Sequence, residues 1–126
     1  MPFPHRIVYL VEDNPVYAEM ICNHFEHKHP SFAVRRFATG EEMMPHLSLP
    51  PNWVILDYFL DGKNECAASG GMILNSIKAL NSAINVIMIT SSENLSIVAN
   101  SLNDGAYAFV LKDEDLLYNL DEMIYG

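Results

Sequence analysis

Short, unbroken apolar runs alternate along this chain with longer stretches whose apolar residues recur every three or four positions. The runs cover residues 7–11, 53–56, 86–89 and 108–111, and a weaker one covers residues 32–37. Unbroken apolar runs are typical of strands buried on both faces. The recurrence of apolar residues every three or four positions in the intervening stretches is typical of helices with one apolar face. The pattern therefore predicts five strands alternating with five helices.

Local signals mark where several of these helices begin and end. Asn14 followed by Pro15 is typical of a helix start. Pro45 falls only two turns into the second helix, so we expect that helix to be short or kinked. Gly105 stands where the fourth helix is expected to end. Since no linker or repeat divides the chain, we expect one α/β domain over residues 1–126, with a parallel sheet, right-handed crossovers and helices on both faces.

Composition narrows the classes of partner. The 126 residues are 50% hydrophobic and 18% charged, which is ordinary for a globular domain. A net charge of -9 repels nucleic acid and anionic membrane, so we expect neither as a direct partner. The absence of a long apolar segment and of a signal peptide favours a cytoplasmic protein. Cys22 and Cys66 stand alone, which argues against a disulfide scaffold or a zinc site.

Polar residues follow four of the five apolar runs. They are Glu12, Asp13, Asp57, Thr90 and Lys112. Because the carboxyl ends of parallel strands meet at one edge of a sheet, we expect these side chains to lie together. Three carboxylates beside one lysine leave an excess of negative charge supplied by oxygen, which suits a hard cation such as Mg²⁺. A metal there would neutralise a phosphoryl group, with Asp57 as the nucleophile.

With Gly105-Ala106 before the last strand and Phe109 within it, this ordered set resembles the receiver domains of two-component response regulators. The resemblance covers essentially the whole chain and implies a flavodoxin-like, doubly wound sheet with strand order 2-1-3-4-5. It implies that Asp57 accepts a phosphoryl group from a sensor histidine kinase or phosphotransfer protein. Lys112 would pair first with Asp57 and then with a phosphoryl oxygen.

The same resemblance implies the remaining site roles. Mg²⁺ or Mn²⁺ would be held by Glu12, Asp13, Asp57 and the backbone carbonyl of Phe59. Thr90 would bond a phosphoryl oxygen and, together with Phe109, act as the switch. The surface of the fourth helix, fifth strand and fifth helix would then change its preference for a downstream protein, and a homodimer through that surface is plausible. The implied function is a signalling switch in a phosphorelay, not a turnover enzyme.

Two departures from the family pattern bear on the site. Asp113 follows Lys112 where the family usually has proline, often with a cis bond before it. A cis bond before a non-proline residue costs about 2.5–4 kcal/mol. A trans Lys112–Asp113 bond is therefore open to this chain, which puts the reach of the lysine in question. The loop at residues 58–71 is also longer than usual. The side chains expected to meet a water molecule that attacks the phosphoryl group are those of Phe59 and Ser92, two residues beyond Asp57 and Thr90. Neither side chain can act as a base, so we predict a slowly hydrolysing acyl phosphate.

Three other classes of protein share part of this pattern. An unphosphorylated receiver-like interaction module would not need the acidic set. A Mg²⁺-dependent aspartyl-phosphate phosphatase needs a second Asp two residues after the nucleophile, where Phe59 stands. A flavodoxin-like carrier binds a phosphate that Glu12 and Asp13 would repel.

The spacing of His24, His27 and His29 does not place all three on one helical face, so it predicts no metal site.

Overall fold

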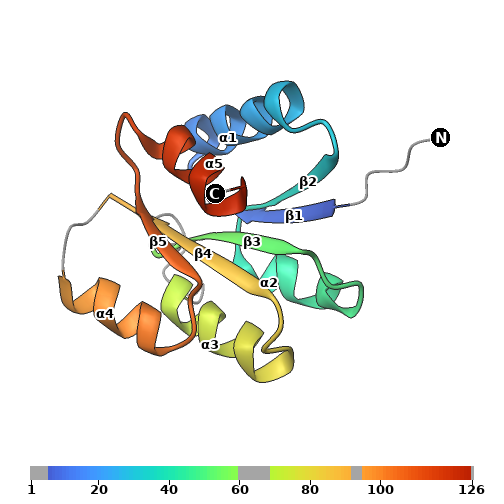
Figure 1. Ribbon diagram of the computed structural model, residues 1–126. Coiled ribbons are helices and arrows are strands. Elements are labelled where there is room, and N and C mark those ends of the chain that lie inside the picture. The colour runs from blue at the N-terminus through green and yellow to red at the C-terminus, as the bar shows by residue number, and fades with distance from the viewer. Residues whose placement is uncertain (1–5, 60–68, 92–94, 126) are drawn as a thin grey trace.

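The predicted architecture is confirmed by the computed structural model, which describes residues 6–59, 69–91 and 95–125 (Figure 1). The strands are β1 (Arg6–Val11), β2 (Phe32–Phe37), β3 (Trp53–Asp57), β4 (Asn85–Thr90) and β5 (Ala108–Leu111). The helices are α1 (Pro15–Lys28), α2 (Gly40–Met43), α3 (Gly70–Leu80), α4 (Leu95–Asn103) and α5 (Leu116–Tyr125), with a 3-10 helix η1 (Met44–Ser48). Most of the long loop, residues 60–68, and Ser92 lie outside the described residues.

All strand pairs are parallel, and the sheet order is β2-β1-β3-β4-β5. Helices α1 and α5 cover one face, whereas α2, α3 and α4 lie on the other (Figure 1). Alternate residues of the central strands therefore enter two separate cores: Val54 and Leu56 pack toward α3, and Ile55 packs toward α1 and α5. Burial of the central strands on both faces explains their unbroken apolar runs.

The local signals act where the sequence places them. The Asn14 side chain accepts a hydrogen bond from the Val16 amide at 2.9 Å and caps α1. Helix α2 ends at Met43, and the chain passes Pro45 in the 3-10 helix, as expected of a helix broken by proline. Gly105 follows α4 with φ of 104°, a conformation that favours glycine.

The carboxyl ends of β1, β3, β4 and β5 meet at one edge of the sheet, where the connections to the following helices begin (Figure 1). In an open parallel sheet this edge is the usual place for ligands, because strand order reverses there. Here the strand order reverses between β1 and β3. Glu12 and Asp13 directly follow β1, and Asp57 is the last residue of β3. Among the described helices, none combines the length and the apolar character required to cross a membrane.

Candidate functional site

Three carboxylates from two neighbouring strand ends form an acidic pocket. Oxygen atoms of Glu12, Asp13 and Asp57 all lie within 4.8 Å of one another. Glu12 is 4% exposed and Asp57 is 3% exposed, so two of these acids are buried, while Asp13 is half-buried. Closely spaced carboxylate oxygens are a donor set that fits Mg²⁺ or Mn²⁺. The pocket thus has the ligand chemistry that the sequence predicts.

Backbone bonds fix the first of these acids in place. The Glu12 amide donates to the Phe37 carbonyl at 3.0 Å, which continues the pairing of β1 with β2 past the end of the strand. Glu12 Oε2 accepts from the Asn14 amide at 3.1 Å. The turn between β1 and α1 therefore holds this carboxylate over the sheet edge and does not leave it to solvent.

Lys112 is the cation of the pocket. Its Nζ lies 3.0 Å from Asp57 Oδ2 and 2.5 Å from Glu12 Oε1, and its side chain is 8% exposed. Its amide donates to the Thr90 carbonyl at 2.8 Å, which sets where the lysine leaves β5. No cis peptide bond occurs among the described residues, so the lysine reaches both acids with a trans bond before Asp113.

Burial and shared charge shift the proton equilibria of this group. Burial raises the pKa of Glu12 from 4.5 to about 7, with a further rise from Asp57 and an opposing effect of Lys112. Burial acts to lower the pKa of Lys112, but its contacts with Glu12 and Asp57 outweigh burial and the pKa is raised. The lysine therefore stays charged, and Glu12 exchanges its proton near neutral pH.

Tyr17 belongs to this site, and the sequence pattern did not reveal it. Lys112 Nζ lies 4.6 Å from the centre of the Tyr17 ring, and the Tyr17 hydroxyl is 3.5 Å from the Lys112 carbonyl oxygen. A cation over an aromatic face is stabilised by the ring quadrupole. On sequence alone Tyr17 is one more member of the apolar face of α1.

Asp57 is held by its own chain as well as by the lysine. Its Oδ1 accepts from the Phe59 amide at 3.2 Å. The Phe59 side chain is 44% exposed and its ring lies edge-on to Tyr58, with centroids 5.0 Å apart. Helix α3 begins against this segment: a Cβ on Gly70 would lie 2.2 Å from the Asp57 carbonyl oxygen, so only glycine fits here without displacement.

The two residues expected to act as the switch lie on β4 and β5. Thr90 is fully buried at the end of β4, one residue beyond Ile89, which pairs with Asp57. Phe109 is half-buried, pairs in register with Met88, and packs against the core between the sheet and α3. Thr90 therefore lies at the end of the strand next to β3, whereas Phe109 lies one strand further out and two register positions back from the carboxyl edge.

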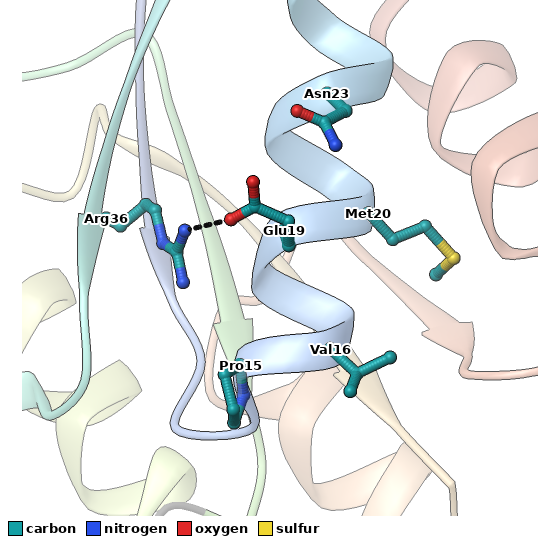
Figure 2. Close-up of a pocket in the computed structure, with 6 residues that line it drawn as sticks. All are labelled: Pro15, Val16, Glu19, Met20, Asn23 and Arg36. Carbon is teal, nitrogen blue, oxygen red and sulfur yellow. Dashed lines mark hydrogen bonds and ion pairs between the residues drawn. The ribbon is translucent and has the colours of Figure 1, made fainter.

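A groove on the surface of α1 adjoins the acidic pocket. Figure 2 shows its lining residues, among which Arg36 Nη1 pairs with Glu19 Oε2 at 2.7 Å. A second hollow is lined by Glu12 and Asp13 and shares Pro15 and Arg36 with the groove. The acidic pocket therefore opens on the side of the molecule that carries the start of α1.

Several solved structures that share this fold are response regulators. The Mn²⁺-bound form of response regulator Rcp1 has a TM-score of 0.78 at 21% identity, covering 94% of this chain and 91% of that one. The phosphorylated cyanobacterial phytochrome response regulator RcpA has a TM-score of 0.79 at 22% identity, with 94% and 92% covered. A CheY-like receiver domain protein from Methanospirillum hungatei JF-1 has a TM-score of 0.77 at 23% identity, with 93% and 91% covered.

The sequence itself identifies the family. The profile described as the response regulator receiver domain matches residues 8–123. The chain belongs to the response regulator receiver domain family. No curated protein matches it.

Proposed function

We propose that this receiver domain takes a phosphoryl group onto Asp57 from a histidine kinase or phosphotransfer protein. The observation that carries the proposal is the position of the Asp57 carboxylate: it is buried, bonded to Lys112, and grouped with two further carboxylates at the sheet edge. An Asp57 oxygen would form the new bond to phosphorus while the bond from phosphorus to the donor's imidazole nitrogen breaks.

Each neighbour of Asp57 has a distinct part in this transfer. The Phe59 amide holds Oδ1, which orients the carboxylate. Lys112 already contacts Oδ2 and is placed to neutralise a phosphoryl oxygen once the acyl phosphate forms. Mg²⁺ or Mn²⁺ held by Glu12, Asp13, Asp57 and the Phe59 carbonyl would supply further positive charge.

Phosphorylation would change the surface of α4, β5 and α5 by moving Lys112 and Thr90. Lys112 directly follows the end of β5 at Leu111, and only three residues separate it from the start of α5 at Leu116. The hydrogen bond that its backbone amide donates to the Thr90 carbonyl couples the ends of β4 and β5 directly. Thr90 would move toward the phosphoryl group and Phe109 would turn into the space released. A downstream protein, or a second copy of this chain, would read that change, so the domain acts as a switch and not as a turnover enzyme.

Intact mass spectrometry after incubation with Mg²⁺ and a small acyl phosphate tests the transfer. The parent chain is expected to gain the mass of one phosphoryl group, and Asp57→Asn is expected to gain none. Asp104→Asn removes an exposed carboxylate between α4 and β5 and serves as the matched control. An unmodified parent, or an equal gain in Asp57→Asn, would exclude the proposal.

A further inference from the structure

A second cluster of ligand-type side chains lies away from the acidic pocket, where the end of α1 meets α5. His24 Nε2 is 2.8 Å from Asp121 Oδ1, and His29 Nε2 is 2.6 Å from the same oxygen. His24 lies in the last turns of α1, His29 caps its end, and Asp121 lies in the middle of α5. Because α1 runs about 20 Å from its start beside the acidic pocket, the cluster is remote from Asp57.

The two imidazoles are held before any ligand arrives. The His29 ring lies 4.8 Å from the Tyr125 ring, 5.2 Å from Phe25 and 6.2 Å from Phe32, centroid to centroid. Its backbone amide donates to the Phe25 carbonyl at 2.8 Å. The side chains of His29 and His24 are 9% and 12% exposed, so neither ring moves freely. Much of the side-chain ordering that a bound ion would require is therefore already present in the folded chain.

The carboxylate of the cluster is ionised and accessible. Burial acts to raise the pKa of Asp121, but the contacts from His29 and His24 outweigh it and the pKa is lowered. The Asp121 side chain is 30% exposed, so it can turn and leaves the cluster open to solvent. Two fixed imidazole nitrogens and one adjustable carboxylate oxygen are three ligand atoms, all within 4.8 Å of one another.

We propose that His24, His29 and Asp121 bind a transition-metal ion of the Zn²⁺ type. Zinc takes imidazole nitrogen at about 2.0–2.1 Å and carboxylate oxygen at about 2.0–2.2 Å, which separates tetrahedral ligand atoms by about 3.3 Å. The present nitrogen–oxygen distances of 2.8 and 2.6 Å need to open by only about half an ångström or slightly more. Turning the Asp121 carboxylate, whose side chain is 30% exposed, lengthens both distances, and the solvent-facing side offers a fourth position.

The nature of the ligands separates this site from the acidic pocket. Mg²⁺ prefers oxygen ligands and retains waters, whereas imidazole nitrogens favour Zn²⁺ and its neighbours in the transition series. The chain therefore carries two sites for two classes of ion.

A metal that joins His24 and His29 at the end of α1 to Asp121 would link α1 to α5, which is one of the helices that the proposed switch uses. Binding to the folded state alone would also raise stability.

The test is competition for Zn²⁺ between the full chain and a chromophoric chelator of micromolar affinity, with excess Mg²⁺ present to occupy the acidic pocket. The parent is expected to retain one equivalent of Zn²⁺. His24→Gln and Asp121→Asn keep hydrogen-bonding groups but lose a good zinc ligand, and each is expected to weaken binding at least tenfold. His27→Gln is the matched control, because His27 is exposed on the same helix and contacts the Asn23 carbonyl.

Thermal melts supply a second measurement that does not depend on the chelator. One equivalent of Zn²⁺ is expected to raise the Tm of the parent and of His27→Gln, and to leave the Tm of His24→Gln and Asp121→Asn unchanged. A parent chain that retains no Zn²⁺ would overturn the proposal and leave the cluster as a hydrogen-bonded contact between helices. Equal retention by the parent and both ligand variants would overturn it as well. The phosphoryl acceptor test at Asp57 is independent of either result.

Discussion

Replacing Asp57 by asparagine is expected to stabilise the metal-free domain above neutral pH. Lys112 Nζ lies 3.0 Å from Asp57 Oδ2 and 2.5 Å from Glu12 Oε1, so one cation faces two buried carboxylates. Asparagine keeps the length of the side chain and can still accept a hydrogen bond from the lysine. It removes the repulsion between Asp57 and Glu12 and leaves Glu12 paired with Lys112.

The size of this effect follows from the shifted proton equilibrium of Glu12. Its pKa rises from 4.5 to about 7, chiefly through burial and secondly through Asp57. Such a rise corresponds to at most about 3 kcal/mol of stability lost when Glu12 is ionised. Because burial is the larger cause, we expect the variant to recover about 1 kcal/mol. For a domain of this size, this is a Tm increase of about 4 °C.

The effect has a defined pH dependence. The folded-state pKa of Glu12 lies above its unfolded value, so the stability linked to its proton is fully present below pH 4.5 and is lost as the pH rises through about 7. Near pH 5 the folded chain holds Glu12 protonated, and there is little repulsion for the substitution to relieve. The stabilisation is therefore expected near pH 8 and is expected to vanish or reverse near pH 5.

Thermal melts in the presence of a chelator, at both pH values, measure the difference between Asp57→Asn and the parent. Asp104→Asn removes one exposed negative charge elsewhere and controls for net charge. A lower Tm for Asp57→Asn near pH 8 would refute the reasoning, as would the same gain at both pH values or an equal gain in Asp104→Asn.

Three further substitutions test parts of the site. Phe59→Asn is expected to speed hydrolysis of the acyl phosphate by admitting water, whereas Phe59→Leu keeps it slow; equal decay rates by intact mass would contradict this. Tyr17→Leu removes the ring 4.6 Å from the site lysine and is expected to slow phosphorylation about threefold without unfolding; an unchanged rate would argue against the contact. Gly70→Ala places a Cβ 2.2 Å from the Asp57 carbonyl oxygen and is expected to cost about 1–3 kcal/mol in denaturant melts. Gly71→Ala, whose Cβ would lie 3.4 Å from the nearest atom, is the control, and equal losses would contradict the close approach.

Much of the fold follows from periodicity, because strands buried on both faces leave unbroken apolar runs that end where the polar edge begins. Glu12, Asp13, Asp57 and Lys112 could be placed together from the rule that the carboxyl ends of parallel strands meet at one edge. The reach of Lys112 could not be predicted, since it depends on the peptide before Asp113 and on the backbone at the end of β5.

Contacts between residues on helices far apart in the sequence could not be predicted from the hydrophobic pattern. Tyr17 looked like an ordinary apolar-face residue, because nothing local indicates that α1 passes over Lys112. In the sequence His24 and His29 stand beside His27, and the spacing of these three residues does not place them on one helical face. The missing member was Asp121, which lies 97 and 92 residues further along the chain and meets the two rings only through packing of α5 against α1.

Chemical mapping of the phosphorylated residue tests the central claim most directly. Borohydride reduces an aspartyl phosphate to homoserine, which marks the acceptor permanently for peptide sequencing by mass spectrometry. After reaction with Mg²⁺ and a small acyl phosphate, we predict homoserine at position 57 and at no other aspartate. Homoserine at Asp13 or at an exposed aspartate, with position 57 unchanged, would contradict the assignment of this pocket as a phosphoryl acceptor site.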